Sequence, residues 1–316
     1  MNVPVRYLES AQAERLISHE TGVEWFKQRM RILRCNPAFA AAASDYARNM
    51  VDLYKGRYLI NRAIANVARQ TICTAILSFY FERTEKTGPF LSSIQNLTTA
   101  MNLCSRNTTA ANIVLLERVG LVTRTENSRD RRWRSIRPTE QLIKEVEGFL
   151  RANLAVADAL FPARRYCELI DTNEDVLERS FANSIHSLLI TNSFTRDLPG
   201  SQIFDTSDGG KILLLKLMSL KGTSQSTADD IVEFPFEEVG SLFGLSRTHV
   251  RRLMKKAEAG GFVSLLEDGG RRVQILPPLE AFFENIVALN VARAQFDLHL
   301  ANGDYDLLPI DPFRAH

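Results

Sequence analysis

The sequence predicts a mainly α fold with small β wings, built as two winged helix-turn-helix modules in tandem and joined by long helices in a pseudo-two-fold duplication. Three observations lead to this prediction. The chain has 316 residues, which is more than one hydrophobic core usually serves. Apolar residues recur at helical spacing over most of its length. One segment of the chain also occurs a second time, with the same polar and glycine positions.

The repeat is clearest at Ser105–Val122, which aligns without a gap with Ser246–Val263 and shares five of eighteen residues. Chance predicts about one identity over this length. Four residues beyond the aligned segment also recur, and their spacing predicts that the second copy has lost one loop residue. They are Arg131, Arg132, Pro138 and Glu140, which recur as Arg271, Arg272, Pro278 and Glu280.

The second copy has the element order of a winged helix. Phe236–Phe243 is expected to be a short amphipathic helix, with Gly244 at the turn. Ser246 is the expected N-cap of a second helix that ends near Ala259, before Gly260 and Gly261. Two strands should follow, Phe262–Leu266 and Arg272–Leu276, around a turn at Glu267–Gly270.

The second helix of this copy has two chemically different faces. Val250, Leu253, Met254 and Ala257 form one apolar stripe, and cationic side chains occupy the other side. A cationic helix in the major groove, followed by a basic hairpin over the phosphates, is a plausible means of reading DNA. The candidate DNA-binding residues of this copy are Arg247, Thr248, His249, Arg251, Arg252, Lys255, Arg271 and Arg272.

The first copy repeats the plan with a different surface. Helices are expected at Ser93–Leu103 and Ser105–Val119, with strands near Leu121–Thr125 and Trp133–Arg137. Apolar residues replace the cations on its second helix, so either this face packs against a partner or another part of the molecule, or the helix is buried on all sides. The apolar residues are Ala110, Ala111, Val114 and Leu115. The remaining candidate DNA contacts are Arg106, Asn107 and Thr108 on the helix and Arg129, Arg131, Arg132 and Arg134 in the wing.

The run S-R-D-R-R-W-R-S-I-R-P-T at Ser128–Thr139 resembles the wing of the multiple-antibiotic-resistance regulator (MarR) family. The preceding S-R-x-T…L-E-x-x-G-L-V pattern is similar to the family's recognition helix, so the resemblance covers residues 90–142. It implies that Arg129 and Arg131 contact DNA while Asp130 braces them. It also implies dimers built from terminal helices and a small aromatic effector.

The rest of the chain is predicted to be helical, and it divides the molecule into five parts. Loops are expected at Thr195–Gly210 and Lys221–Asp230. The predicted domains are an N-terminal helical segment (1–57), a first winged-helix domain (58–160), a helical linker (161–206), a second winged-helix domain (207–300) and a C-terminal tail (301–316). The long helices are expected at Pro37–Lys55, Tyr58–Glu82, Thr139–Leu160, Asp171–Asn192 and Pro278–Leu300.

Composition narrows the class of protein. The net charge is only +2, but the basic residues cluster, which favours a polyanionic partner. The chain has no apolar run of membrane-spanning length and no leader-like start, so we expect a cytoplasmic protein that does not enter a membrane. The four cysteines lie far apart in the sequence and form no C-x-x-C pair, which favours reduced thiols over a disulfide framework or a zinc site. Motifs for hydrolases, zinc proteases and P-loops are missing, so we expect neither an enzyme nor a cofactor.

Three hypotheses about function follow. The first is a transcriptional regulator that binds double-stranded DNA, as a monomeric pseudo-dimer or a homodimer. The second is a plasmid-type replication initiator, which also uses tandem winged helices. The third is an interaction module that has the fold but does not bind DNA, as the apolar first helix suggests.

Overall fold

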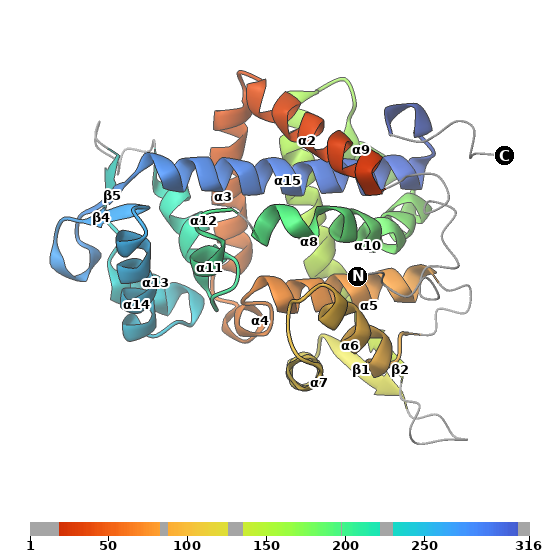
Figure 1. The fold of residues 1–316 in the computed structure, drawn as a ribbon, viewed down its shortest axis with the longest axis horizontal. Coiled ribbons are helices and arrows are strands. Elements are labelled where there is room, and N and C mark those ends of the chain that lie inside the picture. The colour runs from red at the N-terminus through yellow and green to blue at the C-terminus, as the bar shows by residue number, and fades with distance from the viewer. Residues whose placement is uncertain (1–18, 83–87, 126–134, 197, 222–229, 309–316) are drawn as a thin grey trace. The chain divides into compact units, whose positions relative to one another are not determined.

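The computed structural model describes residues 19–82, 88–125, 135–196, 198–221 and 230–308 (Figure 1). In these ranges the chain is mainly helical with small antiparallel sheets, which confirms the predicted class at that level. It forms two compact units. Unit 1 comprises Met1–Leu33, Thr71–Ser193 and Leu289–His316, and unit 2 comprises Arg34–Gln70 and Phe194–Ala288. The five-part division predicted above sets its boundaries at other residues and stays a prediction.

Unit 1 is a set of helices that carries the first module. Its aromatic core includes Trp25, Phe26 and Phe296, whose ring centroids lie 5.0–5.4 Å apart. Several of its helices extend across a boundary between the units. The helices that belong wholly or partly to unit 1 are α2 (His19–Cys35), α5 (Val67–Glu82), α6 (Leu91–Ala100), α7 (Arg106–Arg118), α8 (Glu140–Leu160), α9 (Tyr166–Thr172), α10 (Glu174–Arg196) and α15 (Pro277–Asn302).

The first module is α6, α7 and a two-stranded hairpin, β1 (Val122–Thr125) and β2 (Ser135–Pro138) (Figure 1). Ser105 caps α7, since its Oγ accepts the Thr108 backbone N–H at 3.2 Å. The turn before it passes through Asn102, which adopts a positive φ of 52°. Phe90 forms an isolated bridge with Ser135, so the segment before α6 adds to the hairpin edge.

Unit 2 carries the second module. Helices α3 (Phe39–Tyr54) and α12 (Gly210–Leu220) pack against each other through buried side chains such as Ala47, Met50 and Leu217. Phe204, Phe262 and Phe282 form a buried aromatic cluster. The remaining elements are α4 (Tyr58–Ala63), α11 (Ser201–Phe204), β3 (Ile231–Val232), α13 (Phe236–Phe243), α14 (Arg247–Ala259), β4 (Val263–Leu265) and β5 (Val273–Ile275).

The second module is α13, α14 and an antiparallel sheet in the order β3-β5-β4 (Figure 1). Its helices lie as the sequence predicts. Ser246 caps α14 by accepting the His249 backbone N–H at 3.2 Å. Gly244 takes a positive φ of 76°, and Gly240 lies so close to Leu245 that a Cβ there would be 2.5 Å from its carbonyl oxygen.

The two modules share the geometry of the second helix. Both α7 and α14 have 13 residues and begin after the capping serine. Each ends with the same backbone bond, from Leu121 to Leu116 and from Phe262 to Ala257, at 2.9 Å in both. The glycine before each donor has a positive φ, 77° at Gly120 and 73° at Gly261. The gapless alignment of this segment therefore has a structural counterpart.

The predicted alignment of the hairpins is wrong. Val122 pairs with Pro138, whereas its counterpart Val263 pairs with Ile275. Pro138 therefore corresponds to Ile275, and Pro278 lies instead in the first turn of α15. The second hairpin is shorter by four residues rather than one, because it closes through a tight turn at Asp268–Gly270.

Three expected elements also differ. The predicted helix Tyr58–Glu82 breaks after Ala63, because the Asn66 side chain caps α5 by accepting the Arg69 backbone N–H at 3.1 Å. The predicted loop 195–210 contains α11. The predicted start at Asp171 lies within α9, and the chain is extended at Asn173 before α10 begins.

Candidate nucleic-acid interface

Helix α14 is amphipathic in the predicted sense. The inner residues Val250, Leu253 and Met254 are at most 3% exposed, and Ala257 is fully buried. The outer face is exposed along the whole helix, and its residues are Arg247, Thr248, Arg251, Arg252, Lys255 and Lys256. Burial of the apolar stripe fixes the rotation of the helix and leaves the cations facing solvent.

Three cations on this face are available to an external partner. Arg247, Arg251 and Lys255 follow one another at intervals of four residues, so they form one row. None of them makes a hydrogen bond or ion pair with any residue that the structure describes. No described residue therefore neutralises their charges, and within the described part of the chain the row presents positive potential to solvent.

Two other predicted contacts are engaged inside unit 2. The His249 Nε2 atom lies 2.7 Å from the Asp208 carbonyl oxygen, and the Arg252 guanidinium lies 3.0 Å from His249 Nδ1. The arginine can only donate, so His249 accepts at Nδ1 and donates from Nε2, as in the neutral ring. The Asp208 carboxylate in turn accepts from Asn66 and pairs with Arg69. This network anchors the first turn of α14 and orients Arg252.

The hairpin beside α14 brings two further arginines to the surface. Arg271 and Arg272 are both exposed, and Arg272 lies 3.6 Å from the Glu267 carboxylate. The turn is held against the segment that links β3 to α13, since Phe234 donates its backbone N–H to the Gly270 carbonyl at 2.8 Å. A Cβ at Gly270 would lie 2.1 Å from the Phe234 carbonyl oxygen, so this approach requires glycine.

The first module presents a different surface. Arg106 donates to the Asn96 side chain at 2.8 Å, so it connects α7 to α6, and the Thr108 hydroxyl contacts Ser105. Asn107 is exposed. Ala111 is exposed and Val114 is 36% exposed, so the expectation of a helix buried on all sides is wrong.

The predicted wing residues Arg129, Arg131, Arg132 and Arg134 lie outside the described residues. In the strands that flank these residues in the sequence, Arg137 on β2 is exposed, and Arg124 on β1 pairs with Glu117 at 3.1 Å. Arg137 was missed as a candidate, although strand alternation from the buried Ile136 would have placed it on the outer side. Lys256 was missed because it follows Lys255 at the margin of the cationic face.

No helix among the described residues is long and apolar enough to span a membrane. The chain carries a cationic helix face and hairpin in unit 2, and a mainly apolar counterpart in unit 1. Comparison with known proteins assigns no family to the chain. No family model matches it, and neither a curated protein nor a solved structure matches it.

Proposed function

We propose that this protein is a DNA-binding transcriptional regulator in which α14 enters the major groove and the β4–β5 hairpin lies along the phosphate backbone. On this proposal the chain is a tandem of two winged helix-turn-helix modules. The observation that carries it is the row of exposed cations at Arg247, Arg251 and Lys255, which no described residue neutralises. Arginine and lysine on an exposed helix are the side chains that bind guanine edges and phosphates.

The hairpin supports the same orientation. Arg271 and Arg272 lie in a short turn that is held to the module by the Gly270 contact. Two cations on a fixed turn beside a cationic helix suit a duplex, whose backbone runs on both sides of the groove. The surface has no metal-binding cluster in the described part of the chain.

Binding of a fluorescent random duplex, measured by anisotropy over a range of salt concentrations, tests the proposal. Arg251→Ala and Lys255→Ala should each weaken binding, and a lost phosphate contact should lower the slope of log affinity against log salt by about one. Arg31→Ala removes the same charge from an exposed position on α2 and is the matched control. Unchanged affinity in both α14 variants would rule out this face as the DNA-binding surface.

A second function for the first module is favoured by its exposed apolar face. Ala111 and Val114 replace Arg252 and Lys255 and cannot donate to base edges. We propose that α7 contributes a protein contact rather than base recognition. Selection of binding sites from random DNA should then yield one strongly constrained half-site, and two equally constrained halves would contradict this.

A further inference from the structure

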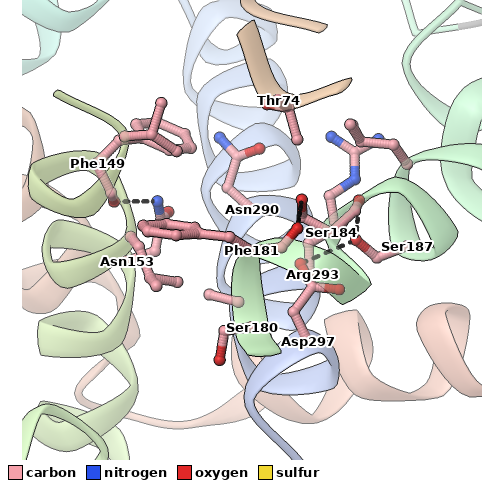
Figure 2. Close-up of a pocket in the computed structure, with 14 residues that line it drawn as sticks. Thr74, Phe149, Asn153, Ser180, Phe181, Ser184, Ser187, Asn290, Arg293 and Asp297 are labelled. Atoms are coloured by element: carbon pink, nitrogen blue, oxygen red, sulfur yellow. Dashed lines mark hydrogen bonds between the residues drawn. The ribbon is translucent and has the colours of Figure 1, made fainter. Parts of the chain in front are cut away.

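The part of α15 in unit 1 carries polar side chains on two opposite faces, and the proposed DNA contacts use neither. On one face, Arg293 and Asp297 line a cavity of about 100 Å³ together with α5, α8 and α10 (Figure 2). Ser187 donates to the Asp297 carboxyl at 3.1 Å. Burial raises the pKa of that carboxyl well above its usual range, and the Ser187 hydrogen bond and the Arg293 charge act in the opposite direction. The arginine on this face therefore has an acid of its own helix beside it.

The opposite face of α15 holds an arginine of α2 in a fixed position. Gln295, which is fully buried, accepts from the Arg29 Nε atom at 2.8 Å. The Arg29 guanidinium carbon lies 4.8 Å from the centroid of the Phe161 ring, and a hydrogen bond joins Arg29 to the Tyr166 side chain. These three contacts hold the guanidinium from α15, from the end of α8 and from α9, while Arg29 stays partly exposed.

The turn between α8 and α9 brings a second arginine to this guanidinium. Arg164 donates its backbone N–H to the Phe161 carbonyl at 3.0 Å, and its side chain is exposed. Burial lowers the pKa of Arg29, and the Arg164 charge also lowers it, while Tyr166 acts in the opposite direction. Arg29 and Arg164, which we call the arginine pair, are therefore two like charges held within electrostatic range of each other. An anion that contacts both would offset their repulsion.

The acids close to the arginine pair are engaged by other groups. Asp158 accepts the backbone N–H groups of Tyr166 and Cys167, at 2.5 and 3.0 Å, with one carboxylate oxygen for each. The Asp304 carboxylate lies 3.2 Å from Nδ1 of His299. No carboxylate among the described residues forms an ion pair with either member of the arginine pair. The pair therefore has no counter-ion within the part of unit 1 that the structure describes.

We propose that the arginine pair binds a small molecule that carries a phosphate dianion. Two guanidinium charges match a charge of about −2, and the N–H groups of arginine match the spacing of phosphate oxygens. A phosphate of the DNA backbone carries a single negative charge, so it matches the pair less well. Arg29 is the fixed, half-buried contact, and the exposed Arg164 approaches the ligand from the solvent side. This inference does not rest on the proposed function.

Calorimetric titration of the full chain at about pH 8, where a phosphate monoester is a dianion, tests the proposal. Methyl phosphate should bind at least tenfold more tightly than dimethyl phosphate or acetate, which carry one charge each. Arg29→Gln and Arg164→Gln should each reduce the affinity for methyl phosphate at least tenfold. Arg31→Gln, at an exposed position on α2, and Arg165→Gln, next to Arg164, are the matched controls and should leave it unchanged.

The Arg164→Gln variant keeps the test independent of folding, because Arg164 is exposed. Methyl phosphate should raise the midpoint of thermal unfolding of the parent chain and of Arg165→Gln, but not of Arg164→Gln. The proposal fails if methyl phosphate does not bind at millimolar concentration, or if dimethyl phosphate binds as tightly. Equal affinity in Arg164→Gln and Arg165→Gln would also overturn it.

A duplex titration separates this site from the proposed DNA-binding face. Arg164→Gln should bind random duplex DNA as tightly as the parent chain does, whatever the α14 variants do. Weaker duplex binding by Arg164→Gln, together with no binding of methyl phosphate to the parent, would assign the arginine pair to the DNA backbone and overturn the proposal.

Discussion

At the scale of single residues, two serines account for much of the similarity between the modules. Ser105 and Ser246 accept a backbone N–H from the third residue of the helix that each begins, at 3.2 Å in both cases. They could be recognised in the sequence because an N-cap is a local chemical device whose partner lies three residues away. The partners of Asp208 could not be recognised, because His249 lies 41 residues further along the chain.

We expect Ser246→Ala to lower the free energy of unfolding by about 1 kcal/mol, because the His249 amide loses its acceptor. Ser246→Asp keeps an acceptor at that position and should recover most of the loss. Urea denaturation measures both variants. Ser241→Ala, at an exposed position on α13, is the control and should change stability by less than about 0.5 kcal/mol. A loss in the control equal to that in Ser246→Ala would refute the capping role.

His186 predicts a pH dependence of stability in unit 1. Burial lowers the pKa of His186 from 6.5 to about 4. Within this window the unfolded chain binds a proton that the folded chain does not, so the free energy of unfolding should fall as the pH falls from 6.5 to 4. The expected contribution is on the order of 1–3 kcal/mol.

Comparing His186→Gln with the parent chain isolates this contribution, because the buried Asp297 has a raised pKa and acts with the opposite sign. Urea denaturation at about pH 7 and about pH 5 should show a smaller loss of stability on acidification in His186→Gln than in the parent. Equal losses in the two proteins would show that His186 does not resist protonation in the folded state.

At the scale of secondary-structure elements, prediction succeeded where the pattern was local and periodic. The bounds of α13 and α14 follow from the spacing of the apolar residues and from the glycines and serines that flank them. The break after Ala63 was missed, because the apolar periodicity continues across Asn66 and the cap bond to Arg69 interrupts it. The hairpin alignment failed because the register depends on turn length, which matching residue types do not reveal.

The contrast between α7 and α14 leads to an element-scale prediction. Ala111 and Val114 occupy the positions of Arg252 and Lys255 on helices of the same length and capping. Because both α7 positions are exposed, cations should be tolerated there. Ala111→Arg combined with Val114→Lys should increase affinity for random duplex DNA and raise the salt slope by up to about two.

Anisotropy titrations measure the gain, and the double exchange Ala41→Arg with Asn49→Lys on α3 is the control, since it adds two cations at exposed positions of another helix. If the control gains as much affinity as the α7 variant, the effect is one of net charge alone. In that case α7 has no access to DNA.

At the scale of the whole molecule, each compact unit contains one helix–turn–helix–hairpin module, and one chain connects them. Winged-helix regulators normally dimerise, so that two recognition helices reach half-sites about 34 Å apart. On the proposed function one chain carries both modules, but α14 alone reads bases and α7 contributes a protein contact. One half-site then suffices, so a partner subunit is not needed to reach a second one.

We therefore expect a monomer that binds DNA with one chain per site. Light scattering coupled to size exclusion should give a mass near 35.6 kDa at micromolar concentration, and the same measurement on the DNA complex should show one chain per duplex. The exposed apolar face of α7 is the one argument for a homodimer over a monomer, because a homodimer would cover Val114. A stable species of twice the mass would favour that dimer, and Val114→Lys should then dissociate it, since two buried lysines would face each other across the interface.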